Sequence, residues 1–155
     1  MTSPPDPATK QEAEAEYRRA LVENNQDEKA ELRLGDIESH RGQVQRAFEH
    51  YSRAAALQPS DADAKLGLAN TLIEMKQTDQ AMSLLEQAVK LEPTSAVAHY
   101  RLGTLYHKCG RAEDAQREIE LYKKYRDAKQ KLTVMYQELM IHPEQSDPDE
   151  APATE

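Results

Sequence analysis

The stretch ALQPSDADAKLGLAN at residues 56–70 returns in outline as KLEPTSAVAHYRLGT at residues 90–104. Each copy reads leucine, a polar residue, proline and two short polar residues, followed by a helix-forming segment with a leucine beside a small residue. The two copies start 34 residues apart. Because a fixed period of about 20 to 50 residues is typical of repeat architectures, we expect the chain to be an array of one small structural unit.

The period extends over most of the chain. Residues 28–61 and 62–95 share eight identities, where chance at ordinary composition gives about two or three. The small and apolar residues that recur at this spacing are Ala30, Ala64 and Ala98; Leu34, Leu68 and Leu102; Gly35, Ala69 and Gly103; Ala47, Ala81 and Ala115; and Pro59 and Pro93. Small residues at fixed places indicate that helix backbones approach one another closely there.

Each unit is predicted to form two helices. The first helix is expected over 28–41, 62–75 and 96–109, and the second over 44–57, 78–91 and from 112 onward. Gly42 and Gly110 stand where a left-handed residue would end the first helix, and Lys76 fills that place in the middle unit. Asp61 and Ser95 are expected to cap the first helices that they precede, and Thr78 to cap the second helix of the middle unit.

The composition supports an all-α fold and excludes several classes of function. Ala, Leu, Glu, Gln, Lys and Arg, which favour helices, dominate the middle of the chain. A net charge of −8 argues against a nucleic-acid partner, because phosphate binding needs a surplus of Lys and Arg. No run of ten apolar residues occurs, so neither a membrane span nor a signal peptide is expected. A single cysteine, Cys109, favours a reducing compartment, and we expect the protein to be cytoplasmic.

These residues resemble the tetratricopeptide repeat family, whose 34-residue pattern pairs a leucine with glycine or alanine and closes on proline. The resemblance covers residues 28–127. It implies an α-solenoid of antiparallel helix pairs, with three full repeats, an N-terminal half repeat and a C-terminal extended or capping helix. Its aromatic first position is filled here by Glu31, Lys65 and His99, and its tyrosine, kept as Tyr106, is Glu38 in the first unit.

The resulting division of the chain has seven parts. They are a disordered tail (1–7), an N-terminal helix (8–24), three repeats (28–61, 62–95 and 96–127), a C-terminal helix (128–141) and a disordered acidic tail (142–155). The N-terminal helix reads as the second helix of a unit that lacks its first. It is expected to cap the first repeat, although it could instead meet a second subunit or mark the end of a longer array.

The C-terminal helix carries an apolar stripe at spacings of three and four residues, which includes Leu132, Met135, Tyr136 and Leu139. We expect a kink near Asp127, after which the helix folds back as an ordinary cap. The alternative is one fused helix, about 45 Å long at 1.5 Å per residue, that forms a homodimer through its stripe.

No constellation of residues for catalysis is recognisable in the sequence. His107 and Cys109 point to different sides of one helix, so we expect Cys109 to be a buried or half-buried thiol rather than a nucleophile. The histidines form no zinc-binding motif, and no glycine-rich phosphate loop occurs. We therefore expect no enzymatic activity, no metal and no cofactor.

The resemblance places a partner-binding groove on the first helices of the units, where the family binds a peptide or helix of another protein. The groove residues carried over are Leu32, Arg33, Asp36, Leu66, Asn70, Ile73, Tyr100, Arg101, Thr104 and His107. The family's clamp for C-terminal carboxylates is not expected, since its Lys and Asn places hold mostly other residues here. A scaffold or adaptor is the leading interpretation. The alternatives are a dedicated chaperone, similar in layout to type III secretion translocator chaperones, and a regulatory subunit of an enzyme complex.

Overall fold

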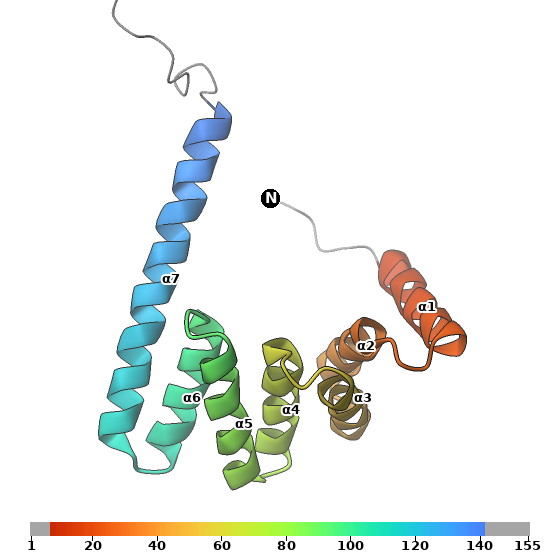
Figure 1. The fold of residues 1–155 in the computed structure, drawn as a ribbon, viewed down its shortest axis with the longest axis horizontal. Helices are drawn as coiled ribbons and strands as arrows, with labels where there is room; N and C mark the ends of the chain where they lie inside the picture. The colour runs from red at the N-terminus through yellow and green to blue at the C-terminus, as the bar shows by residue number, and fades with distance from the viewer. Residues whose placement is uncertain (1–6, 142–155) are drawn as a thin grey trace, which may run out of the picture.

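The computed structural model describes residues 7–141, and in that range the chain forms seven helices and no strand. The helices are α1 (Pro7–Glu23), α2 (Glu28–His40), α3 (Val44–Leu57), α4 (Ala62–Glu74), α5 (Thr78–Leu91), α6 (Ala96–Lys108) and α7 (Ala112–Ile141). They stack in chain order as antiparallel pairs (Figure 1). The expected all-α solenoid is confirmed. The tails expected at 1–7 and 142–155 lie outside the described residues, except that Pro7 begins α1.

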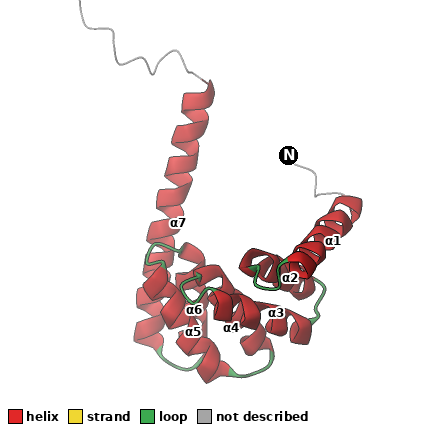
Figure 2. Ribbon diagram, turned by 45° about the vertical axis from the view of Figure 1, so that its right-hand side comes forward, coloured by secondary structure: helices red, strands yellow, loops and turns green. Residues whose placement is uncertain are grey.

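Short loops separate the helices at a regular spacing (Figure 2), and the same local devices end each first helix. Gly42, Lys76 and Gly110 have φ of 72°, 61° and 76°, as the sequence predicts. Left-handed backbone is unfavourable for a residue with a side chain by about 1–2 kcal/mol. The middle unit therefore keeps its turn with Lys76 at a cost that the two glycines avoid.

The caps predicted for α4 and α6 are confirmed, whereas the cap predicted for α5 is wrong. Asp61 accepts hydrogen bonds from the backbone of Asp63 and Ala64, and Ser95 accepts one from Ala98. Thr78 does not cap α5, because the helix starts at Thr78 itself and Gln77, which makes no side-chain cap, precedes it. The prediction of a Thr78 cap is wrong because the left-handed turn at Lys76 feeds directly into the helix.

The packing between the first two units centres on Tyr51 of α3. Its ring is 4% exposed and lies between two glycines, Gly35 of α2 and Gly67 of α4. A Cβ atom added at Gly35 would lie 2.7 Å from the ring, far inside van der Waals contact. The alanines at the helix crossings, such as Ala47 and Ala81, are fully buried. The recurring small residues thus serve helix approach, as expected.

Histidine–carboxylate hydrogen bonds occupy the aromatic first position of the family pattern in two units. In the first unit Glu31 lies 2.6 Å from Nδ1 of His50, and in the third His99 Nδ1 lies 2.6 Å from Glu118. The two pairs occupy equivalent places, 68 residues apart, with the acid and the histidine exchanged. Nε2 of His99 also donates to the carbonyl of Pro93 at 2.8 Å. A histidine–carboxylate contact therefore stands at both joints, and in the third unit the His99 ring also packs on an aromatic residue, Tyr125.

Helix α1 is fixed to the array by a network of ion pairs with α2. Glu14 accepts hydrogen bonds from Arg18 (2.6 Å) and Arg41 (2.5 Å), and Arg18 also reaches the buried Glu38 (3.3 Å). The guanidinium of Arg41, followed by that of Arg18, lowers the pKa of Glu14 to about 2. The network anchors the N-terminal half repeat on the first unit.

Helix α7 is a single 30-residue helix, so the expected kink near Asp127 is absent and that expectation is wrong. Neither proline nor glycine occurs between Ala112 and Ile141, and nothing interrupts the backbone hydrogen bonds. The first half of α7 packs against α6, and the second half projects beyond the stack (Figure 1).

Candidate functional site

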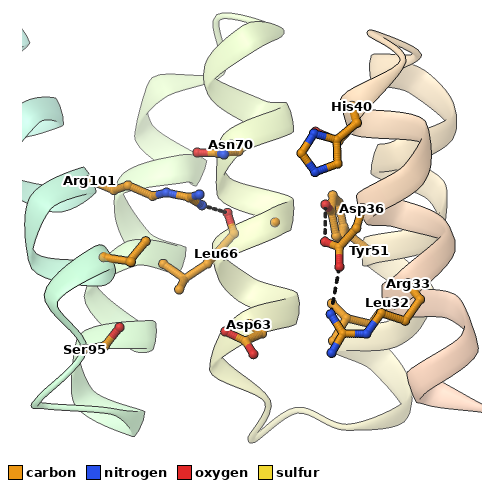
Figure 3. A pocket seen from close by; sticks show the side chains of 13 residues that line it. Leu32, Arg33, Asp36, His40, Tyr51, Asp63, Leu66, Asn70, Ser95 and Arg101 are labelled. Atoms are coloured by element: carbon orange, nitrogen blue, oxygen red, sulfur yellow. Dashed lines mark hydrogen bonds and ion pairs between the residues drawn. The ribbon is translucent and has the colours of Figure 1, made fainter. Parts of the chain in front are cut away.

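A hollow of about 380 Å³ lies on the first helices of the three units, on the face that the repeat pattern predicts for a groove. Its lining comes mainly from α2, α4 and α6 (Figure 3). The residues that line it are Leu32, Arg33, Asp36, Ser39, His40, Tyr51, Asp63, Leu66, Gly67, Asn70, Ser95, Val97 and Arg101. Because each helix starts at a fixed place in its unit, side chains 34 residues apart come to lie in neighbouring rows.

One wall of the hollow is a hydrogen-bonded group around Asp36. The hydroxyl of Tyr51 donates to one oxygen of Asp36 at 2.9 Å, and Arg33 donates to the other at 3.1 Å. Burial, and then the hydrogen bond to Asp36, raise the pKa of the Tyr51 hydroxyl. Tyr51 therefore stays a neutral donor, and both oxygens of Asp36 are already occupied within the protein.

The opposite wall carries Arg101, which reaches from α6 across α4 (Figure 3). One of its nitrogens donates to the backbone carbonyl of Leu66 at 3.1 Å. In residues 7–141 no carboxylate pairs with this guanidinium, and burial lowers the pKa of Arg101. Gly67, beside Leu66, occupies the place that holds Arg33 and Arg101 in the other units. The middle unit therefore contributes no side chain there, which leaves space in front of Arg101.

A second hollow, of about 620 Å³, continues the groove toward the N-terminus. Lys10, Ala13 and Tyr17 of α1 line it, together with residues of α2. The two hollows share Arg33, Asp36 and His40, so they adjoin along α2, and we refer to them together as the groove. Helix α1 therefore adds a wall to the groove beside α2.

Six of the ten groove residues predicted from the sequence line this groove. They are Leu32, Arg33, Asp36, Leu66, Asn70 and Arg101.

The other four predicted groove residues lie elsewhere. Ile73 is partly buried against the core. The ring of Tyr100 packs against Tyr122 of α7, with centroids 5.1 Å apart, and is 50% exposed. Thr104 and His107 line a separate hollow of about 420 Å³ between α6 and α7. This hollow lies at the open end of the stack, where a further unit would cover α6 and α7. The family's groove positions are defined for units with a neighbour on both sides, so they do not predict where side chains of α6 lie at this end of the stack.

Tyr17 and His40 also line the groove, although they are not among the residues predicted from the sequence. The register of Tyr17 with Tyr51 was visible, but a second helix is normally covered on this side. His40 is the last residue of α2, and it lines both hollows, which only the structure shows.

The remaining candidate chemistry does not assemble into a site. Cys109 is exposed at the end of α6, so the expectation of a buried or half-buried thiol is wrong. The turn that ends α6 at Gly110 places Cys109 at the surface. No cluster of three potential metal ligands occurs between residues 7 and 141. Within the same range, no helix has the length and apolar character needed to cross a membrane.

Comparisons with protein families agree with this architecture. One tetratricopeptide repeat model matches residues 39–88 and again 72–132, and a second matches residues 10–62. No curated protein matches the chain significantly.

Solved structures with the same fold include three proteins of different description. The crystal structure of MamA has a TM-score of 0.65 at 23% identity, covering 70% of this chain and 64% of that one. PilF of Pseudomonas aeruginosa has a TM-score of 0.67 at 18% identity, covering 72% and 51%. The second repeat domain of Spaghetti (RPAP3), bound to the HSP90 peptide SRMEEVD, has a TM-score of 0.61 at 22% identity, covering 67% and 97%. The chain thus spans 64% of MamA and 51% of PilF, and the likeness shows the fold.

Proposed function

The chain belongs to the tetratricopeptide repeat family, and on that premise we propose that it is a non-enzymatic interaction module that binds a segment of a partner protein in its groove. The segment lies across α2, α4 and α6 and extends toward α1. Binding positions and tethers the partner, and the role is that of a scaffold or adaptor.

The observation that carries this proposal is the state of Arg101. A half-buried guanidinium has five donors, yet Arg101 uses one for a backbone carbonyl and has no carboxylate partner in the described part of the chain. Asp63, which lines the same hollow, attracts this cation without pairing with it, so the cost of removing the guanidinium from water is only partly offset. An acidic side chain of a ligand would supply that charge and accept two parallel hydrogen bonds.

The surroundings of Arg101 specify the rest of the ligand. Val97, one turn earlier on α6, is 52% exposed at the rim of the same hollow. The amide of Asn70 faces the hollow from α4 and can bond to an extended backbone. We therefore propose a segment with an acidic residue next to an apolar one.

The Spaghetti (RPAP3) neighbour supports the class of ligand, since the peptide SRMEEVD in that structure places acids beside apolar residues. The mode of binding differs in our proposal. Of the places of the family's carboxylate clamp, only the one at Arg101 holds a residue of the required kind, and the others hold Leu32, Asp36, Gly67 and Val97. We therefore propose recognition of an internal acidic side chain by Arg101 and not of a chain terminus.

The proposal is tested by capture of proteins from native lysate on immobilised wild-type chain and on two charge-reversal variants. Arg101→Glu removes the unpaired cation. Arg46→Glu is the matched control, because Arg46 is an exposed residue of α3 that does not line the groove. We expect a set of proteins held by the wild type and by Arg46→Glu and lost with Arg101→Glu. Circular dichroism of each variant verifies the fold.

A synthetic peptide from a captured protein then distinguishes the internal acid from a terminus. An amidated peptide that retains its internal acid should bind as well as the free acid form. Capture of the same proteins by all three chains would contradict the groove as the binding site.

A further inference from the structure

The last half of α7 carries an exposed apolar stripe. We call residues 128–141 the C-terminal arm. Leu132, Met135, Tyr136 and Leu139 recur there at helical spacing and are 50%, 58%, 62% and 49% exposed. Exposure of this much contiguous apolar surface on one helix face is typical of an interaction site.

The stripe continues the face by which α7 packs on α6. The ring of Tyr125 stacks on His99 of α6, with centroids 5.4 Å apart. One turn further, Ala128 is exposed, because α6 begins at Ala96 and covers α7 no further. Tyr125, Ala128, Leu132, Met135 and Leu139 follow one another at spacings of three and four, the seam of a two-stranded coiled coil. The arm is thus a coiled-coil strand that lacks its partner along residues 128–141.

We propose that the partner is the arm of a second copy of this chain, bound antiparallel, so that the protein forms a symmetric dimer. In this arrangement Leu132 faces Met135 of the second copy, and Ala128 faces Leu139 of the second copy. The small Ala128 leaves room for the leucine where the arm meets the body of the repeat array. The pairing is isologous, so every contact occurs twice.

Charge along the stripe selects this orientation. In the antiparallel register the flanking residue Lys131 lies beside Glu138 of the second copy, and the symmetric contact repeats it. A parallel pair would instead place Lys124 beside Lys129 of the second copy, and like charges at flanking positions are unfavourable. Lys131 and Glu138 are both exposed, and neither makes an ion pair within residues 7–141. The antiparallel pair of helices therefore has two attractive charge contacts where the parallel pair has two repulsive ones.

Sedimentation of the full chain over a wide range of concentration tests the dimer by a charge-reversal cycle. Lys131→Glu and Glu138→Lys should each weaken association about tenfold, because each reversal makes two attractive contacts repulsive. The double variant restores both contacts and should return to the wild-type affinity. Lys123→Glu, which changes the net charge equally but lies off the seam, is the control. A double variant no tighter than either single one would overturn the antiparallel register.

Cysteine cross-linking reads the orientation directly. In the background Cys109→Ser, the variants Leu132→Cys and Met135→Cys should form a disulfide with each other when mixed, and little when alone. Disulfides formed by each variant alone would show a parallel pair and overturn the proposal. A chain that stays monomeric at every concentration, or a dimer that survives Leu132→Asp, would overturn it as well. Leu132 is 50% exposed and belongs to neither buried core cluster, so we expect that substitution to leave the repeat array intact, which circular dichroism verifies.

Discussion

Gly67 should not tolerate even one added methyl group, although alanine favours helices. A Cβ atom built on Gly67 would lie 2.6 Å from Cδ1 and Cζ of the Tyr51 ring. The ring cannot retreat, because Gly35 lies against it on α2 and its hydroxyl bonds to Asp36 at 2.9 Å. Overpacking of this kind costs about 1–3 kcal/mol, while replacing glycine by alanine within a helix gains about 1 kcal/mol. The net effect is a loss, and we expect Gly67→Ala to lower the free energy of unfolding by up to about 2 kcal/mol.

Gly103→Ala is the matched control on the third unit. Its added Cβ would lie 3.0 Å from Cδ1 of Ile119, the end of a flexible side chain, and 3.2 Å from Cβ of Glu118, a milder approach than at Gly67. Ile119 can rotate away, so the gain in helix propensity should dominate and stabilise the fold by up to about 1 kcal/mol. Urea unfolding followed by far-UV circular dichroism measures both variants.

The decisive comparison uses Tyr51→Leu as a second background. The equivalent place in the middle unit holds Leu85, so leucine suits this joint. Without the ring, Gly67→Ala should become stabilising, and the sign of its effect should reverse. If Gly67→Ala raises the unfolding midpoint in the wild-type background as Gly103→Ala does, the ring is not wedged between the glycines and the packing argument is wrong.

Two further predictions concern charged groups. The hydrogen bond to Asp61, followed by burial and charge repulsion, raises the pKa of Glu28 from 4.5 to about 7. The protonated Glu28 side chain therefore stabilises the fold fully below pH 4.5, and this contribution is lost as the pH rises through 7. Glu28→Gln should therefore match the wild type in thermal unfolding at pH 4.5 and exceed it at pH 8, by less than about 1 kcal/mol because the site is solvated. His99→Ala, which leaves Glu118 unpaired, should cost about 3 kcal/mol in urea unfolding, whereas the reversal His99→Glu with Glu118→His should lose only about 1 kcal/mol. Equal losses in the two variants would contradict a direct pairing of the residues.

The sequence predicted the parts of the fold that depend on local signals. The 34-residue period, the caps at Asp61 and Ser95 and the left-handed Lys76 each follow from a few adjacent residues. The course of α7 near Asp127 was predicted wrongly, because a capping helix was expected from the family while no residue there could break the helix.

The groove was predicted only in part, for a reason of geometry. Repeat positions are equivalent inside an array, where each unit has a neighbour on both sides. At the ends that equivalence fails. Tyr100 turns to Tyr122, and His107 lines the hollow between α6 and α7, while Tyr17 of α1 lines the hollow beside α2. The contact between His99 and Glu118 could not be predicted from the sequence either, because the two residues lie on different helices joined by a loop.

The length of α7 draws attention to Asp127, an exposed residue in the middle of the helix. Pro59 and Pro93 end the second helices of the first two units, and Asp127 occupies the same place in the third. Proline at this position turns the chain into a new unit, whereas Asp127 lets the helix continue as an arm. Among residues 7–141 a second helix thus ends where proline follows it and runs on where Asp127 stands, so this one position separates a turn into another layer from a projecting arm.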